Sequence, residues 1–267
     1  MKKIRLPLLC FLLLTALFLF GVTLYPHSPT LPSGGSLEAP GLSHILGTDN
    51  LGVDVFAQIS AGFFRSMVIG LSAAAVTFLL GGVLGIGAGY LGGKADLAIS
   101  FLINVLLSIP QLPVMIVIGA FFGQSTVNII LIIAAFSWAP IAKQLRAKTI
   151  SVKHAAYITL ARSYGGGHWY IVTRHMLAEL LPLLTVNAIA VVGSAIVQES
   201  SLAFLGLSDP LARSWGLMIA RAKEFPGIFF TDFWLWWLLP PVGALLASTV
   251  SLRMLAKNLE ACWLREG

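Results

Sequence analysis

The sequence predicts an all-α fold, a polytopic membrane bundle of six transmembrane helices. Of its 267 residues, 57% are hydrophobic and only 10% are charged, and the mean hydropathy is +0.89. A soluble domain carries about 25% charged residues. This chain has too few charges to cover a surface in water, so lipid must be its main solvent. Uncharged runs long enough to cross a bilayer recur along the chain, and they predict the individual helices.

Residues 6–24 carry no charge and form the first predicted span. At about 1.5 Å per residue, a helix of this length reaches roughly 28 Å, close to the apolar thickness of a bilayer. The preceding Lys2, Lys3 and Arg5 give it the charge order of a signal peptide. However, the apolar run is long and no clear small-residue cleavage motif ends it. We therefore expect an uncleaved helix over residues 1–25.

Residues 26–65 are predicted to be a linker, because they begin with the proline-, glycine- and serine-rich stretch PHSPTLPSGGS. The core of the protein is then expected over residues 66–267, with a second span at 66–93. That span carries Gly81, Gly85 and Gly89, a doubled G-x-x-x-G pattern on one helical face. Glycines at this spacing let another helix approach closely in lipid, so we expect a helix-packing face here.

Residues 97–142 are uncharged and too long for one helix. The turn residues at 123–126 divide them into spans three and four. Pro110 and Pro113 are expected to kink span three, and Pro140 to mark the inner end of span four. Residues 180–198 begin the fifth span and residues 233–252 form the sixth. Six spans place both termini on the same side.

Basic residues predict which side that is. With a cytoplasmic N-terminus, 13 of the 17 Lys and Arg residues lie inside and 4 lie outside. The inside group is Lys2, Lys3, Arg5, Lys94, Lys143, Arg146, Lys148, Lys153, Arg162, Arg174, Arg253, Lys257 and Arg265; the outside group is Arg65, Arg213, Arg221 and Lys223. The positive-inside rule therefore predicts cytoplasmic termini and an extracytoplasmic linker. The basic balance needs no nucleic-acid partner to explain it.

No enzyme constellation is present in the sequence. The chain lacks the G-x-x-x-x-G-K-[ST] motif, and its glycine triplet at 165–167 has no following lysine, so we predict no nucleotide site, catalytic residue or cofactor. Cys10 and Cys262 lie at opposite ends of the chain and have no metal-ligand spacing, so no metal site is predicted either.

The loop at about 143–181 is basic and broken by glycines. We expect a short helix over 153–164, a break at the glycine triplet, and a second helix over 168–181 that enters the membrane at Pro182. Tyr157, Leu160, Ala161 and Tyr164 recur at helical spacing and form a small apolar face. This face either fits a groove on a soluble partner or lies on the lipid surface, and the spacing alone favours neither.

Three motifs resemble those of ABC importer permeases of the peptide and nickel subfamily. Residues 159–165, T-L-A-R-S-Y-G with Leu-Pro at 181–182, resemble the cytoplasmic E-A-A-x-x-x-G motif, although Thr159 replaces its glutamate. Residues 44–54, H-I-L-G-T-D-N-L-G-V-D, resemble H-x-x-G-T-D-x-x-G-R-D, with Val53 in place of arginine. Residues 199–207, E-S-S-L-A-F-L-G-L, resemble E-x-x-L-S-F-L-G-L, and residues 214–218, S-W-G-L-M, resemble S-W-G-x-M. Together these two segments form the third motif, which is the most specific of the three. The usual C-terminal motif is reduced to K-N-L-E at 257–260.

The resemblance implies a type I ABC importer permease fold in a bacterial inner membrane. Such a chain is half of a pore and pairs with a homologous or identical permease subunit. Two cytosolic ABC ATPases dock on the coupling loop, and an extracytoplasmic binding protein delivers the solute, a short peptide or a nickel or other metal chelate. The implied ATPase-coupling residues are Tyr157, Thr159, Leu160, Ala161, Arg162, Tyr164 and Gly165. The implied motif near the outer mouth comprises Gln198, Glu199, Ser200, Ser201, Phe204, Gly206, Trp215 and Gly216.

Two questions stay open at the level of sequence. Glu199 either holds the segment F-L-G-L at 204–207 through hydrogen bonds to its backbone or lines the solute path. The chain as a whole could alternatively be a secondary transporter or channel that works without an ATPase, or a membrane scaffold whose loop recruits a partner. Nearly charge-free spans and the lack of a convincing repeat speak against a secondary transporter.

Overall fold

The computed structural model describes residues 2–209 and 213–266, and in these ranges the regular structure is helical apart from one isolated bridge between Thr48 and Asp54. Five segments are long and apolar enough to cross a membrane: α1 (Lys2–Thr23), α2 (Val55–Leu91), α5 (Thr126–Lys153), His168–Phe204, which ends in α8 (Leu177–Phe204), and the segment containing α11 (Leu239–Glu266). A sixth crossing comes from α3 (Gly93–Ser108) and α4 (Gln111–Phe122), counted as one bent span. The all-α polytopic bundle is confirmed.

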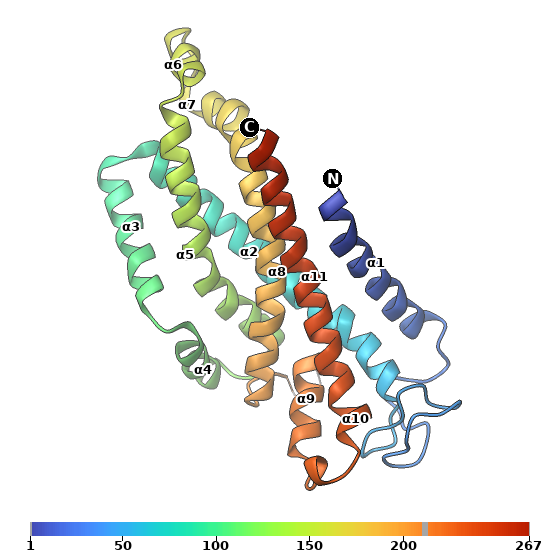
Figure 1. The fold of residues 1–267 in the computed structure, drawn as a ribbon. Coiled ribbons are helices and arrows are strands. Elements are labelled where there is room, and N and C mark those ends of the chain that lie inside the picture. The colour runs from blue at the N-terminus through green and yellow to red at the C-terminus, as the bar shows by residue number, and fades with distance from the viewer. Residues whose placement is uncertain (1, 210–212, 267) are drawn as a thin grey trace.

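The helices form an elongated bundle with α2 obliquely at its centre (Figure 1). The short helix α6 (Ala156–Ser163) projects at one end, where both chain ends also lie. The linker before α2, α9 (Trp215–Glu224) and α10 (Trp234–Trp237) occupy the opposite end. The side chains of Lys2, Lys3 and Arg265, which entered the charge count, lie outside those that the structure describes.

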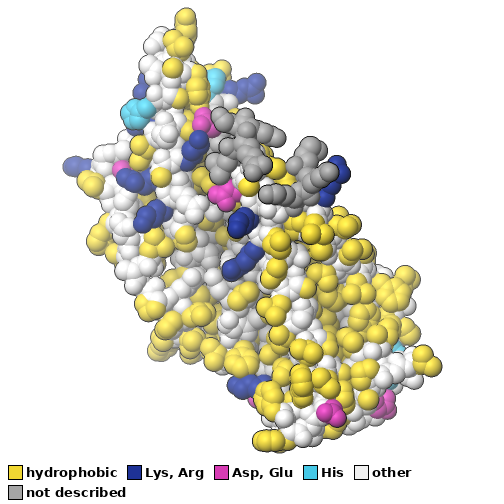
Figure 2. Space-filling model, in the orientation of Figure 1, with side chains coloured by type: hydrophobic (Ala, Val, Ile, Leu, Met, Phe, Trp, Pro, Cys, Tyr) yellow, Lys and Arg dark blue, Asp and Glu magenta, His cyan; other side chains and the backbone are white. Residues whose placement is uncertain are grey.

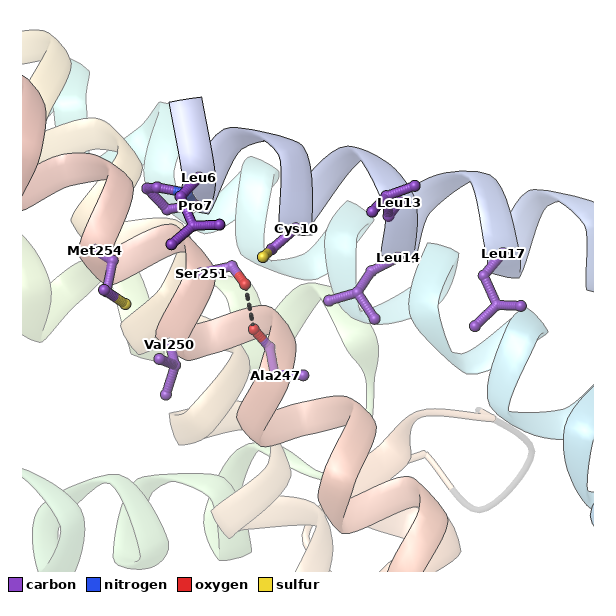
Figure 3. A pocket seen from close by; sticks show the side chains of 10 residues that line it. All are labelled: Leu6, Pro7, Cys10, Leu13, Leu14, Leu17, Ala247, Val250, Ser251 and Met254. Atoms are coloured by element: carbon purple, nitrogen blue, oxygen red, sulfur yellow. Dashed lines mark hydrogen bonds between the residues drawn. The ribbon is translucent and has the colours of Figure 1, made fainter. Parts of the chain in front are cut away.

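Helix α1 is the peripheral member of the bundle. Only 17% of its most apolar window is buried, against 44% in α2 and 50% in α5. Between α1 and α11 lies an apolar groove of about 500 Å³. Figure 3 shows Cys10 and leucines of α1 on one side of it, and on the other Ser251, whose hydroxyl donates to the Ala247 carbonyl at 2.6 Å. With its serine bonded to its own helix, the groove is suited to contact with lipid.

Helix α2 begins eleven residues earlier than the sequence predicted, so the linker ends at Asp54 and not at residue 65. The Asp54 side chain caps the helix by accepting from the Ala57 N–H at 2.8 Å. Arg65 suggested that the helix begins after it, but its guanidinium donates to the Thr126 hydroxyl of α5. A charge with a protein partner can lie within a membrane helix, which the linear pattern does not reveal.

Of the prolines in the spans, Pro110 lies at the predicted kink of span three. Ile109 and Pro110 separate α3 from α4 by a 91° bend, because the residue before a proline is driven to an extended conformation. Pro113 lies harmlessly in the first turn of α4. Pro140 and Pro182 were expected at membrane boundaries, yet α5 and α8 continue through them. Membrane helices tolerate such prolines when neighbouring groups satisfy the freed backbone.

The three small residues of the predicted packing face lie against α5. A Cβ atom built on Gly85 would lie 2.6 Å from the Ala142 carbonyl oxygen, and one on Gly89 would lie 2.8 Å from the Arg146 carbonyl oxygen. At Gly81 the nearest atoms of Ile141 and Trp138 would be 3.1 Å away. The two backbones therefore approach too closely for a side chain on α2 at these positions.

Candidate functional site

The projecting helix α6 is anchored by one buried side chain and by one polar contact to α8. Ile158 is fully buried. Tyr157 donates its hydroxyl hydrogen to Glu179 of α8, which also pairs with Lys148 of α5 at 3.0 Å. Burial and this carboxylate raise the pKa of Tyr157 to about 12, so the tyrosine stays a donor at neutral pH. These contacts hold α6 to the ends of two membrane helices.

The outer face of α6 is open. The side chains of Leu160 and Tyr164 are 58% and 88% exposed, and nearby Trp169 is 80% exposed. Thr159 and Arg162 are exposed too, and Ala161 is half-buried. The apolar face that the sequence predicted is therefore uncovered in the single chain. Ile158, the anchor on the other face, was missed because one apolar residue carries no periodic signal.

Gly165 ends α6 with a left-handed turn, φ +84°. Its N–H donates to the Arg162 carbonyl and the Gly166 N–H donates to the Ala161 carbonyl, both at 3.0 Å. This is the Schellman arrangement, in which glycine is favoured because a Cβ strains the left-handed conformation. The predicted second helix begins at His168, and it runs on into the membrane segment His168–Phe204. Helices α7 (His168–Tyr170) and α8 are continuous through a π-helical turn at Ile171–Met176.

The motif at residues 44–54 forms a compact hydrogen-bonded cluster at the opposite end of the bundle. Asp54 Oδ2 contacts His44 Nδ1 and accepts from the Tyr25 hydroxyl, both at 2.8 Å. Burial and the Asp54 carboxylate raise the pKa of Tyr25 to about 12. The ring of His27 joins this group, with its Nε2 at 2.8 Å from the Ser43 carbonyl oxygen. These protein contacts account for the grouping of His27, His44 and Asp54.

The second aspartate of the motif, Asp49, organises the turn that follows. Its Oδ1 accepts from the Leu51 and Val53 N–H groups at 2.8 and 2.9 Å, and its Oδ2 accepts from Gln58 Nε2 at 2.7 Å. Gly52 has φ +76°, and a Cβ there would lie 2.4 Å from the Gly34 carbonyl oxygen. Val53, where arginine was expected, is 4% exposed and packs as a core residue. The motif is thus explained by local folding.

The outer-mouth motif brings α8, α9 and α2 together. Glu199 is fully buried; its Oε2 accepts from the Ser200 hydroxyl at 3.4 Å, and its Oε1 has no hydrogen-bond partner among the described residues. Ser214 lies beside this carboxyl group and caps α9 by accepting from the Leu217 N–H. A Cβ on Gly216 would lie 2.4 Å from Ser200 Cα, so α9 packs directly on the α8 backbone. The fully buried Trp215 donates to the Ile59 carbonyl of α2 at 3.0 Å. The site is a three-helix junction.

The remaining motif residues lie apart from this junction. Segment 204–207 closes through its own backbone, with the Gly206 N–H donating to Ala203 and the Leu207 N–H to Leu202. Among the described residues no hydrogen bond joins Glu199 to that backbone, and its carboxylate accepts from Ser200 instead. Ser201 donates to the Val197 carbonyl of its own helix, and Phe204 carries Lys223 Nζ over its ring at 4.1 Å.

A polar cleft of about 440 Å³ was not predicted from the sequence. Six of its lining residues are polar: Gln111 of α4, Ser137 of α5, Asn187, Ser194 and Gln198 of α8, and Arg253 of α11. The α8 residues recur at helical spacing, a signal hidden because Asn187 and Ser194 lie in an apolar run and Gln198 lies in the polar run 198–201. Arg253 had been assigned to the cytoplasm, but α11 continues beyond residue 252 to Glu266 and places it within a candidate span.

Comparison with known proteins gives a consistent result. Residues 81–261 match the family described as binding-protein-dependent transport system inner membrane component. The chain is 29% identical to the probable D,D-dipeptide transport system permease protein DdpC of Escherichia coli K12 over 249 residues, 92% of this chain and 82% of the relative. It is 34% identical to the glutathione transport system permease protein GsiD of Pectobacterium atrosepticum, over 70% of this chain and 62% of the relative.

The dipeptide transport system permease protein DppC of Bacillus subtilis 168 is 32% identical over 224 residues, 82% of this chain and 70% of that protein. The family match covers more than half of the chain and includes α5, α8 and α11. Because the membrane bundle and this match agree, the chain belongs to the binding-protein-dependent transport system inner membrane components, as a multi-pass permease subunit of an ABC importer.

Proposed function

We propose that this permease subunit imports short peptides as one half of a pore completed by a second permease subunit, homologous or identical. Two cytosolic ABC ATPases drive it, and an extracytoplasmic binding protein delivers the peptide. The family match over residues 81–261 carries the proposal. The three relatives described above are named for D,D-dipeptide, glutathione and dipeptide transport, which favours a peptide over a nickel chelate.

The orientation that we propose places both termini and α6 in the cytoplasm. Figure 2 shows most of the visible Lys and Arg side chains over the upper half of the bundle, towards the α6 end, and mainly apolar side chains over the lower half. The hydrogen-bonded cluster at residues 44–54 then lies on the outer side, where the binding protein docks. Residues 1–25 remain a peripheral helix in this proposal, and the permease core begins with α2 at residue 55.

Cysteine labelling tests this orientation. In a background with Cys10 and Cys262 changed to serine, Ser36→Cys is expected to react with a membrane-impermeant maleimide in intact cells. Ser163→Cys is expected to react only after permeabilisation, because α6 lies inside. Both serines are exposed in the structure, so burial does not explain a difference. Labelling of Ser163→Cys from outside would reverse the orientation and remove α6 from the ATPase side.

The coupling role that we propose for α6 follows from its attachment and its open face. Its anchor residue Ile158 and the Tyr157–Glu179 contact link it to α8, while Leu160 and Tyr164 remain free to enter a groove on an ATPase. A helix fixed to two membrane helices transmits a push from the ATPase to the bundle. The transporter can then shift between two states by the difference in affinity of its ligands for them.

Gly165→Val is expected to leave expression near normal and to weaken ATPase docking and peptide uptake together. A valine at φ +84° strains the turn by about 1–2 kcal/mol, although the space around it is open. Gly167→Val is the matched control, because Gly167 has φ −68° and open space. Co-purification of the ATPase and uptake measure the effect. Equal docking and uptake in the two variants would show that the turn is not a rigid coupling element.

The proposed function is tested in proteoliposomes that contain this chain, its partner permease and the ATPases, with the binding protein added. We expect trialanine to stimulate ATP hydrolysis and to accumulate in an ATP-dependent manner. A nickel–histidine chelate serves as the comparison solute. Accumulation of the chelate without that of trialanine would replace the peptide by a metal chelate. Uptake of either solute without ATP would contradict the importer mechanism.

A further inference from the structure

Arg253 lies within a candidate membrane span and has no ion-pair or hydrogen-bond partner among the residues that the structure describes. It lies near the middle of α11, and its side-chain stem passes the Gly193 position of α8, where a built Cβ would be 3.9 Å from Arg253 Cγ. Within the described part of the chain, no ion pair or hydrogen bond links it to another residue. A charged side chain at bilayer depth costs several kcal/mol unless it faces protein or water.

The surroundings of Arg253 are polar, unlike those of the groove between α1 and α11. Asn187, Ser194 and Gln198 recur along one face of α8 and extend over about 16 Å. Ser137 of α5 and Gln111 of α4 complete the cleft wall. Asn187 Nδ2 also donates to Gln144 Oε1 of α5 at 3.1 Å, which continues the polar surface towards the α6 end. We therefore expect this surface to be hydrated beside the arginine.

Two buried polar atoms in this wall have no partner among the described residues. These are Gln111 Nε2, a donor, and Gln198 Oε1, an acceptor. A buried amide group without a hydrogen bond costs about 1–3 kcal/mol, so such groups normally bind water or a ligand. The cleft therefore offers a cation, free amide groups and hydroxyls at one place.

We propose that this cleft is a binding site for the transported peptide and that Arg253 binds the C-terminal carboxylate of the peptide. The guanidinium is always charged and presents paired donors that match a carboxylate. Amide and hydroxyl groups along α8 donate hydrogen bonds to the peptide backbone and accept hydrogen bonds from it. This inference rests on the proposed function, because it assumes a peptide as solute. It adds a determinant of specificity within the permease itself, separate from the binding protein.

The test compares radiolabelled trialanine with trialanine amide, which lacks the carboxylate, in the proteoliposomes described above. The preference of the binding protein is the same in every assay, so it cancels when the ratio of the two uptake rates is compared between variants. Arg253→Gln is expected to lower the trialanine-to-amide ratio at least about tenfold, the factor for one charge-assisted hydrogen bond. Arg253→Lys should retain most of the ratio, and Lys257→Gln, an exposed control on the same helix, should leave it unchanged.

A second measurement does not depend on the solute. In the background without Cys10 and Cys262, Arg253→Cys in the assembled complex is expected to react with a negatively charged, membrane-impermeant thiosulfonate. Met254→Cys, at the same depth but in the groove beside α1, is expected to react slowly. Equal, slow reaction at both positions would show that the cleft is not hydrated and would overturn the proposal.

The remaining outcomes separate the two levels of the argument. Suppose that the wild-type complex imports trialanine with ATP, but that Arg253→Gln changes neither the trialanine nor the amide uptake rate, or lowers both equally. The proposed carboxylate-binding site is then wrong and the importer assignment stands. Equal loss together with loss of the partner permease would assign Arg253 to the interface between the subunits. If the wild-type complex imports neither peptide with ATP, the proposal of a peptide solute is wrong, and the proposed carboxylate-binding site is wrong with it.

Discussion

Replacing Gly85 by leucine is expected to abolish recovery of the folded protein. The first added carbon alone would lie 2.6 Å from the Ala142 carbonyl oxygen and 2.8 Å from Ala142 Cα, both backbone atoms of α5. Backbone cannot rotate away as a side chain does, so α2 and α5 must separate. Overpacking usually costs about 1–3 kcal/mol, and leucine at this crossing lies at or above the upper end. Size-exclusion chromatography of detergent-solubilised protein before and after heating measures the loss.

Gly87→Leu is the control for this experiment. Gly87 lies two residues further along α2 and has no atom within 4 Å of a built Cβ, because it faces the apolar groove between α2 and α8. Leucine is also a better helix former than glycine by roughly 1 kcal/mol. We expect recovery equal to that of the wild type. Poor recovery of both variants would mean that the chain tolerates no bulk on this helix, and the close crossing would not be the cause.

Alanine substitutions give a graded form of the same prediction. The built Cβ is nearest to backbone at Gly85, slightly further at Gly89, and 3.1 Å from its nearest neighbours at Gly81. The thermal midpoint of the protein in detergent should therefore fall most for Gly85→Ala and least for Gly81→Ala. A reversed order would show that these distances do not govern the packing of α2 on α5.

Glu199→Ala is expected to lose the assembled permease complex, whereas Glu199→Gln retains complex and part of the uptake. The alanine leaves the Ser200 hydroxyl without its acceptor in a fully buried junction and empties the space that the carboxyl group fills beside Ser214. A buried polar group left without its partner costs about 1–3 kcal/mol. The glutamine oxygen can still accept from Ser200, and its side chain fills the same space. Size-exclusion chromatography of the extracted complex, together with uptake, measures the difference.

Ser201→Ala is the matched control for Glu199, since among the described residues the Ser201 hydroxyl bonds to the Val197 carbonyl of its own helix alone. It should assemble like the wild type. Gln198 points into the polar cleft, while Glu199, its neighbour, faces α9. If Glu199→Ala assembles normally and changes which solutes are carried, Glu199 belongs to the solute pathway and its structural role is wrong.

The hydrophobic runs and the positions of glycine and proline alone determined the class of this protein. Uncharged runs predicted every membrane span, because a helix that crosses lipid needs about 20 apolar residues regardless of its neighbours. Gly165 and the G-x-x-x-G face were also visible, since only glycine suits a left-handed turn or a very close helix approach. Helix ends were predicted less well. Helix α2 begins eleven residues before the predicted position, and α5 and α8 continue through Pro140 and Pro182.

The tertiary structure alone decided which side chains meet. Glu199 and Ser214 lie on different helices, and so do Arg253 and the polar residues of α8. In the sequence nothing pairs Glu199 with Ser214, and Asn187 and Ser194 lie within an apolar run. Contacts between helices depend on the rotation and crossing of each helix, which hydrophobic periodicity cannot predict when lipid and protein interior are equally apolar. The bundle turns the scattered polar residues into a junction and a cleft.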